Sequence, residues 1–212
     1  MFNGLGFVLE EPGFHAVFGP SGVGKTSLAR LLTGGIDDFS GDVAFEGLPI
    51  RLYSHNLERL PGWSSVGKHL SRITPPGREA QRETLVEAFG LTGFMDSRFS
   101  RLSLGQRNRV NLLRYLIQHF QLLIMDESLA NVDEQTREQI LLTIKEMFPE
   151  SCFLYISHNV VEVATFCRKI LVLRSPEKSP QAVFVGGQDR RKDARLDERR
   201  LQQSMLEIVN AS

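Results

Sequence analysis

The stretch from Gly19 to Thr26 constrains the fold of this chain more than any other, because it matches the pattern G-x-x-x-x-G-K-[ST]. An apolar run, 14–18, precedes it, and good helix formers, 27–32, follow it. Strand, glycine-rich loop and helix in this order turn successive backbone N–H groups around a phosphate, and the helix aims its positive end at the anion. A glycine-rich turn that fitted by chance would lack these flanking elements. We therefore expect phosphates to bind at Gly19, Pro20, Ser21, Gly22, Val23, Gly24, Lys25, Thr26 and Ser27.

A second pattern supplies acidic groups. The apolar run 122–125 ends in the carboxylates of Asp126 and Glu127. An isolated Asp-Glu pair at a strand end commonly faces solvent, but beside a phosphate loop it suits hydrolysis. We expect Asp126 and the Thr26 hydroxyl to hold Mg²⁺, Glu127 to accept a proton from the attacking water, and Lys25 to reach the β and γ phosphates.

Apolar patterning predicts an α/β fold. The runs 121–125 and 152–157 are apolar along their whole length, which is typical of parallel strands covered on both faces, and a helix is expected between them at 134–147. Alternating apolar residues over 5–9 predict a further strand near the start, and 42–47 has the pattern of a strand and turn.

The middle of the chain has a different pattern. Between residues 64 and 116 there are few β-branched clusters, and a break at Pro75-Pro76-Gly77 is followed by helical periodicity over about 78–89 and again over 106–118. The sequence therefore predicts a mostly helical subdomain inserted into a mixed sheet.

Composition excludes several classes of protein. Lys and Arg total 25 and Asp and Glu total 25, so no net charge draws the chain to nucleic acid or to anionic lipid. The apolar runs are far shorter than the ~20 residues that span a bilayer, and 1–6 lacks the basic start of a secretory signal. Cys152 and Cys167 are too few for a disulfide framework. We expect a soluble chain in a reducing, cytoplasmic setting.

A third pattern carries a family resemblance. The residues 102–110, Leu-Ser-Leu-Gly-Gln-Arg-Asn-Arg-Val, begin a predicted helix, and Ser103 lies 23 residues before Asp126. They are similar to the L-S-G-G-Q signature of ABC transporter ATP-binding subunits. The three patterns in this order distinguish these ATPases from other phosphate-loop enzymes. The resemblance covers about residues 5–173 and implies a P-loop NTPase (RecA-like) mixed sheet with an inserted helical subdomain.

The resemblance also implies roles for further residues, with ATP and Mg²⁺ bound. The stretch 128–133 looks like the family's D-loop, which ends in Asp133, and 155–158 looks like its switch-histidine strand. A lone histidine after an apolar strand is more often structural, but in this sequence of motifs His158 is expected to contact the γ phosphate. Ser103, Gly105 and Gln106 are expected to reach the nucleotide of a partner subunit, so that two cassettes, expected to be identical copies, enclose two ATP molecules.

Four positions depart from the family pattern. Leu104 replaces a glycine of the signature, and Ser128 replaces the usual proline of the D-loop. The Q-loop glutamine has no obvious counterpart; counting back from Leu60-Pro61-Gly62-Trp63 puts Asn56 in its place, either near Mg²⁺ or in a plain loop. Only 18 residues precede Gly19, and Phe2 is the one aromatic among them in a position to stack on adenine, unless it belongs to the core.

We expect one ABC ATPase domain over 1–212, with a RecA-like core (1–60 and 119–187), a helical subdomain (61–118) and a helical tail (188–212). The tail is expected to be an amphipathic helix with an apolar side of Leu196, Leu201, Met205 and Ile208.

The function implied by the resemblance is ATP hydrolysis that powers a bacterial small-solute importer. The chain would sit on the cytoplasmic face of the inner membrane, bound to separate transmembrane permease subunits, with no membrane span of its own and no nucleic-acid partner. The stretch 60–66, Ser175-Pro176 and the late charged helix look like the nitrate, sulfonate and taurine importer group.

Two alternatives remain. A soluble ABC ATPase of DNA repair or translation usually has a long coiled coil or two cassettes, whereas only 78 residues separate Lys25 from Ser103. A hydrolysis-impaired regulatory cassette would fit the departures at Leu104 and Asn56, but Lys25, Asp126, Glu127 and His158 argue against it.

Overall fold

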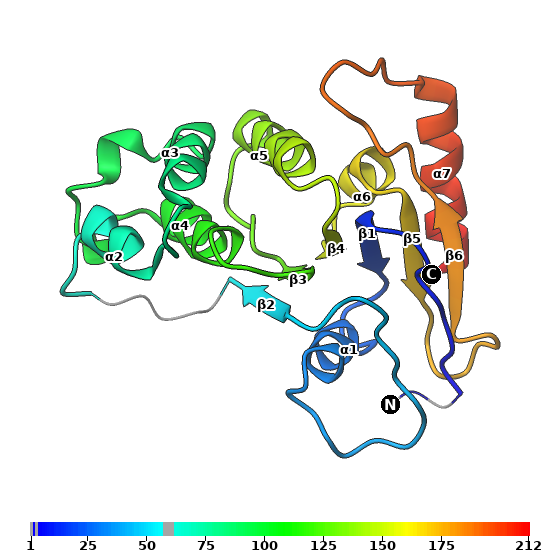
Figure 1. Cartoon of the computed structure of the whole chain (residues 1–212). Coiled ribbons are helices and arrows are strands. Elements are labelled where there is room, and N and C mark those ends of the chain that lie inside the picture. Colours follow the sequence, from blue (N-terminus) through cyan, green and yellow to red (C-terminus); the bar gives the residue numbers. More distant parts are fainter. Residues whose placement is uncertain (1, 3, 57–61) are drawn as a thin grey trace.

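The computed structural model describes residues 2, 4–56 and 62–212, and at its centre is a sheet with the strand order β2-β3-β4-β1-β5-β6 (Figure 1). Neighbouring strands are parallel except β6, which runs antiparallel to β5. This confirms the predicted mixed α/β sheet. The strands are β1 (Gly13–Phe18), β2 (Arg51–His55), β3 (Leu122–Asp126), β4 (Cys152–Ile156), β5 (Lys169–Leu173) and β6 (Ala182–Gly186).

Helices cover both faces of the sheet, because its central strands carry apolar side chains on both sides. Leu123 and Ile124, neighbours in β3, belong to two separate buried clusters. One cluster packs against α1 on one face, and the other packs against α4 to α7 on the opposite face (Figure 1). The helices are α1 (Lys25–Leu32), α2 (Val66–Ile73), α3 (Glu79–Ala88), α4 (Leu104–Leu116), α5 (Glu134–Met147), α6 (Val160–Phe166) and α7 (Glu198–Ala211), with 3₁₀ turns η1 (Thr92–Phe94) and η2 (Phe99–Arg101).

The helices α2, α3 and α4 follow β2 and precede β3, and they form the region at the left of Figure 1. This is the helical insertion that the sequence predicts. The helices α3, α4 and α5 begin and end within two residues of their predicted bounds.

Two predicted strands are wrong. Residues 5–9 and 42–47 form no strand. The alternation over 5–9 is nevertheless real, because Leu5, Phe7 and Leu9 pack against the cluster around α1 while Val8 is 68% exposed. A strand also needs a neighbouring strand edge, and alternation of side chains does not provide one.

The tail differs in part from its prediction. The helix α7 begins only at Glu198, so Leu196 precedes it and is exposed, whereas Leu201, Met205 and Ile208 pack against the core. The short strand β6 pairs with β5 just before this tail.

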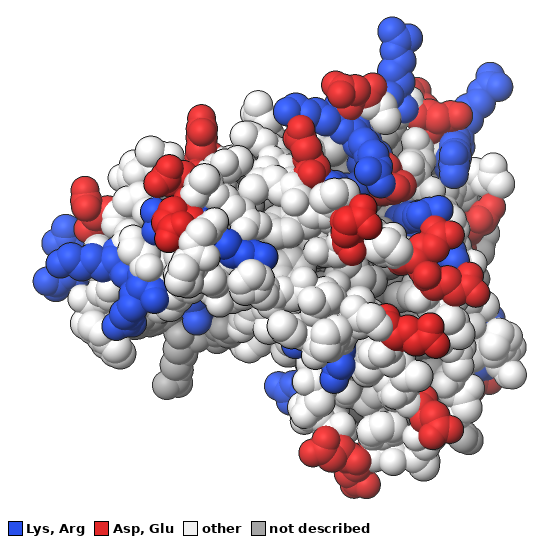
Figure 2. Space-filling model, viewed as in Figure 1, with Lys and Arg blue, Asp and Glu red and all other residues white. Residues whose placement is uncertain are grey.

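The described residues contain no helix whose length and apolar character would allow it to cross a membrane. Acidic and basic side chains are interspersed on the face of the molecule in Figure 2. This mixture agrees with the balanced composition.

Parallel strands bring distant motifs together. β3, β4 and β1 are adjacent and parallel, so their carboxyl ends lie at one edge of the sheet, and β2 ends beside β3. The glycine-rich loop follows β1, Glu127 follows β3, Ser157 and His158 follow β4, and Asn56 follows β2. Ligands of open α/β sheets bind at this edge.

Candidate active site

The loop after β1 has a backbone that requires glycine. Gly19, Gly22 and Gly24 have φ angles of 150°, 80° and 108°. A Cβ on Gly19 would lie 2.5 Å from the carbonyl oxygen of Leu173, and Gly24 caps α1 in a left-handed conformation. The loop therefore curls at the N-terminus of α1, where free backbone N–H groups form a site for an anion.

Lys25 lies across this loop. Its Nζ donates hydrogen bonds to the carbonyl oxygens of Gly19 at 2.7 Å and Pro20 at 2.9 Å. Burial lowers the pKa of Lys25, and the nearby carboxylates of Asp126 and Glu127 act in the opposite direction. Lys25, the first residue of α1, thus places a buried ammonium group beside the glycine-rich loop.

Asp126 lies at the end of β3, next to the loop. Its Oδ2 accepts hydrogen bonds from the Thr26 hydroxyl at 2.9 Å and from the Tyr53 hydroxyl at 2.7 Å. Burial raises the pKa of Tyr53, and the hydrogen bond to Asp126 raises it further, so the phenol stays protonated and remains a donor. Asp126 itself is 8% exposed.

Glu127 is held between two other elements. One carboxylate oxygen lies 2.7 Å from Nε2 of His158, and the other accepts a hydrogen bond of 3.3 Å from the Asn56 amide. The backbone of Glu127 has a φ of 50°, which is uncommon for a residue other than glycine. His158 and Glu127, separated by 31 positions in the sequence, are thus in direct contact.

These groups surround one hollow of about 330 Å³. Its residue set fits a magnesium nucleotide: the loop and Lys25 suit phosphates, and Thr26 and Asp126 supply the oxygen ligands that Mg²⁺ prefers. The described residues hold no cluster of three or more His, Cys, Asp or Glu that would bind a metal unaided, so phosphates and water would complete the ligand set. The lining residues are Ser21, Gly22, Gly24, Lys25, Thr26, Ser27, Asp126, Glu127 and His158.

The predicted signature lies elsewhere, on the first turn of α4. Ser103 caps this helix: its hydroxyl accepts from the backbone N–H of Gln106 at 3.2 Å, and the Gln106 side chain accepts from the N–H of Ser103 at 2.9 Å. These two side chains form a capping box. Neither residue lines the hollow.

Gly105 and Leu104 differ in how strictly they are required. A Cβ on Gly105 would lie 2.2 Å from the carbonyl oxygen of Asn131, so only glycine fits there. Leu104 is the first residue of α4, has no positive φ and is 55% exposed. The backbone at position 104 therefore does not require glycine, and leucine can replace the glycine of the family pattern there.

The predicted D-loop, residues 128–133, packs beside this predicted signature. The Asn108 amide donates to the carbonyl oxygen of Ala130 at 2.6 Å, and Asp133 caps α5 by accepting from the N–H of Thr136 at 2.9 Å. Hydrogen bonds from Thr136 lower the pKa of Asp133. We call residues 103–106 and 130–133 the signature surface; Asp133, like Ser103, lies outside the hollow.

The sequence patterns did not predict the strand β2 or the contacts of two of its side chains, Tyr53 and Ser54. Tyr53 reaches Asp126, and the buried hydroxyl of Ser128 donates to the carbonyl oxygen of Ser54 at 2.9 Å and lies 3.0 Å from its hydroxyl. The apolar and aromatic residues of Arg51-Leu52-Tyr53 were the available signal for a strand.

Three other predictions concern Asn56, the stretch 60–63 and Phe2. Asn56 faces Glu127 rather than Asp126. Leu60 and Pro61, which served to align it, lie outside the described residues, and Trp63 is 80% exposed. Phe2 is partly buried against the cluster around α1, and its stacking on adenine stays a prediction.

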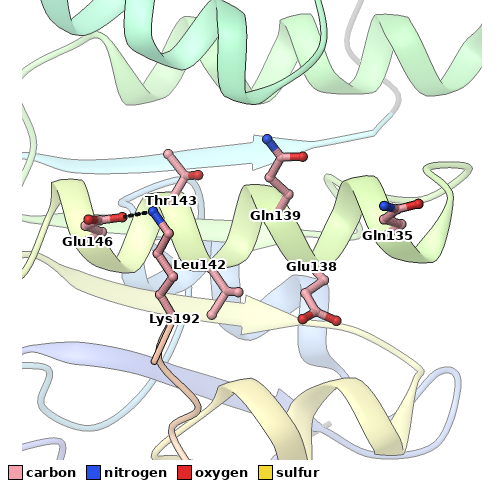
Figure 3. Close-up of a pocket in the computed structure, with 7 residues that line it drawn as sticks. All are labelled: Gln135, Glu138, Gln139, Leu142, Thr143, Glu146 and Lys192. Atoms are coloured by element: carbon pink, nitrogen blue, oxygen red, sulfur yellow. Dashed lines mark ion pairs between the residues drawn. The ribbon is translucent and has the colours of Figure 1, made fainter. Parts of the chain in front are cut away.

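A second hollow, of about 390 Å³, runs along α5 and under Lys192 (Figure 3). All of its lining residues except Leu142 are polar or charged, and Lys192 pairs with Glu146 at 3.6 Å (Figure 3). None of the predicted site residues lines it.

Comparison with known proteins identifies a family for this chain. The family model described as "ABC transporter" matches residues 2–130. The taurine import ATP-binding protein TauB of Pseudomonas savastanoi pv. phaseolicola is 35% identical over 173 residues, which are 74% of this chain and 66% of that protein. The nickel import ATP-binding protein NikE of Rhodospirillum rubrum is 28% identical over 208 residues, 85% of this chain and 74% of that protein.

The molybdenum import ATP-binding protein ModC of Saccharophagus degradans is 31% identical over 182 residues, 77% of this chain and 50% of that protein. The chain thus spans between half and three-quarters of the length of these relatives. Among solved structures, an inward-facing putative metal-chelate type ABC transporter matches with a TM-score of 0.69 at 21% identity, over 86% of this chain and 75% of that one. This likeness shows a shared fold.

Proposed function

The chain belongs to the ABC transporter family, and we propose that it is the ATP-binding and ATP-hydrolysing subunit of a membrane importer for a small solute. The observation that carries this proposal is the single hollow in which the glycine-rich loop, the Thr26–Asp126 pair and the Glu127–His158 pair meet. A phosphate site, a metal site and a base in one hollow are the parts that hydrolysis of a nucleoside triphosphate needs.

Binding would rest on the loop and on α1. The backbone N–H groups after Gly19 would surround the β and γ phosphates, and Lys25 would turn its ammonium from the loop carbonyls to the phosphate oxygens. Thr26 and Asp126 would hold Mg²⁺, which when bound neutralises the charge of the phosphates.

Hydrolysis would use the pair at the ends of β3 and β4. The oxygen of a water forms a bond to the γ phosphorus while the bond to the β–γ bridging oxygen breaks, and Glu127 accepts the water's proton. His158, which contacts Glu127, would hold that carboxylate in place and approach the γ phosphate.

The signature surface would serve the partner's nucleotide. Ser103, Gly105, Gln106 and Asp133 lie outside the hollow of their own chain, which supports a head-to-tail pair of cassettes enclosing two ATP molecules. Binding would close the pair because each γ phosphate gains contacts from both copies, and hydrolysis would reopen it.

Closing and opening would drive separate transmembrane permease subunits and place the chain on the cytoplasmic face of the membrane. The relatives are named for taurine, nickel and molybdenum import. Because these solutes have little chemistry in common, they support import of small solutes as a class. The nitrate, sulfonate and taurine group remains the specific proposal, and the similarity to TauB supports it.

The test is MgATP hydrolysis measured against protein concentration, with ATP binding measured on the same samples. A specific rate that rises with concentration is expected, because each site is completed by a second copy. ATP binding without turnover, in the presence of the permease subunits, would indicate a regulatory cassette instead. Absence of MgATP binding would overturn the proposal.

A further inference from the structure

The carboxyl end of β2 makes a different contact with each of the two acids at the end of β3, Asp126 and Glu127. Tyr53 donates its hydroxyl to Oδ2 of Asp126 at 2.7 Å, whereas Asn56 donates its amide to Oε2 of Glu127 at 3.3 Å. The residue aligned with the Q-loop glutamine therefore contacts the proposed base, and the residue three positions earlier contacts the proposed metal ligand.

The strand register explains this division. In the β2–β3 ladder Tyr53 lies opposite Ile124 and His55 lies opposite Asp126, so Tyr53 and Asp126 are diagonal neighbours. Diagonal neighbours in a sheet are within reach of long aromatic side chains. A tyrosine at this position spans the diagonal and brings its hydroxyl to the carboxylate.

The hydroxyl gives Asp126 a second fixed donor. Thr26 and Tyr53 both donate to Oδ2, from two different elements, so that oxygen is held on two sides. A hydrogen bond to an ionised carboxylate is stronger than one between neutral groups and fixes its orientation. The Thr26 hydroxyl and Asp126 are also the groups expected to hold Mg²⁺.

We propose that Tyr53 is a positioning residue of the metal site: its hydroxyl holds the Asp126 carboxylate in the orientation that binds Mg²⁺ with the nucleotide. This inference rests on the proposed function, since it assumes that the hollow binds MgATP. By this assignment Tyr53 is the residue of β2 that serves the metal site. Asn56, which follows β2, serves Glu127, the proposed base.

Tyr53 also has an ordinary packing role, because its ring lies against the cluster around α1. Tyr53→Phe separates the two roles, since it keeps the ring and removes the hydroxyl. Tyr155→Phe is the matched control: Tyr155 lies in β4 of the same sheet, and burial together with the nearby carboxylate of Glu162 raises the pKa of its hydroxyl.

The experiment measures ATP affinity for each variant, by displacement of a fluorescent ATP analogue, once with Mg²⁺ and once with EDTA. Tyr53→Phe is expected to lose about tenfold in affinity with Mg²⁺, the size of one hydrogen bond to a charged group, and to match the natural chain in EDTA. Binding of Mn²⁺ with ATP, followed by electron paramagnetic resonance, should weaken in parallel. Tyr155→Phe should keep the natural ratio of the two affinities.

An unchanged ratio in Tyr53→Phe, or an equal loss with and without Mg²⁺, would overturn the inference and leave only the packing role. Asn56→Ala is a second, independent test: it should keep the metal dependence of ATP binding, and a loss of that dependence would assign the metal site to Asn56 instead. If the natural chain bound no MgATP, the proposed function itself would fail, which is a separate result.

Discussion

The hollow at the sheet edge and the signature surface use polar side chains in opposite ways. In the hollow, side chains from distant parts of the sequence bond to one another, as Thr26 does to Asp126 and His158 to Glu127. On the signature surface, side chains bond within three residues of themselves, as Ser103 does to Gln106 and Asp133 to Thr136. The polar side chains of the hollow are therefore joined by folding, whereas those of the signature surface cap their own helices, and the two segments of that surface meet through the bond from the Asn108 amide to the carbonyl oxygen of Ala130.

This difference predicts which property a substitution in each of the two regions should alter. A change in the hollow should alter what a single chain does with ATP. A change on the signature surface should leave that binding intact and alter the stability of the chain or the activity that depends on a second copy.

The largest expected effect is that of Glu127→Gln. This change keeps the size of the side chain and one acceptor oxygen but replaces the other oxygen with an amide group and removes the base, so hydrolysis should fall by ~10²–10⁴. ATP affinity of the single chain should be preserved. Steady-state phosphate release and equilibrium ATP binding measure the two quantities, and a loss of binding in this variant would contradict the assigned role.

Gly105→Ala should have the next largest effect. The added Cβ would lie 2.2 Å from the carbonyl oxygen of Asn131, so α4 or the D-loop must move, at a cost of about 1–3 kcal/mol in the free energy of unfolding. Chemical denaturation measures this cost. Leu104→Ala, at the exposed neighbouring position, is the control and should change stability little; equal losses in both variants would show that the close contact is not the cause.

Ser103→Ala should remove the cap of α4 and lower the free energy of unfolding by about 1 kcal/mol. It should also lower the concentration-dependent part of the ATPase rate while ATP binding by one chain stays the same. Asp197→Ala, which removes the cap of α7, is the matched control for lost stability. If both variants lowered the rate equally, the signature surface would have no role beyond capping.

The smallest expected effect concerns pH and the helical region that carries the signature. Burial lowers the pKa of His69, and the positive charges of Arg114 and Arg72 lower it further. The folded chain thus binds fewer protons than the unfolded chain below pH 6.5, so this contribution to stability is present above pH 6.5 and is lost as the pH falls below it.

His69→Leu should therefore flatten the dependence of unfolding free energy on pH between about 7 and 5, by less than the ~1.4 kcal/mol per pH unit that one proton allows. Neither ring nitrogen of His69 has a hydrogen-bond partner among the residues that the structure describes, so leucine loses no such bond. His119→Gln, at an exposed histidine, is the control. A slope that stayed the same in His69→Leu would refute this origin.

Much of the fold follows from local patterns. The apolar run before Asp126 and the helix 134–147 are recognisable because burial on both faces and a 3.6-residue period leave direct marks on neighbouring residues. The segments 5–9 and 42–47 show where this reasoning fails, because alternation reports which side chains turn inward and not whether a strand edge lies alongside.

The residues proposed for the site divide in the same way. Lys25, Asp126 and Glu127 each stand in a short motif and could be singled out one by one. Tyr53 could not, because nothing near it in the sequence indicates that it reaches an aspartate 73 positions away. Ser54 and Ser128 likewise form a buried pair across 74 positions.

The sequence by itself determined the glycine-rich loop, the helix that begins near Ser103, and the strand that ends in two acids, because torsional preference and side-chain periodicity act over a few neighbouring residues. Only the tertiary structure decided that Tyr53 holds Asp126, that Asn56 faces Glu127 and that the signature lies outside the hollow. These outcomes depend on which strands lie side by side and in what register, and that is settled by the packing of the whole sheet.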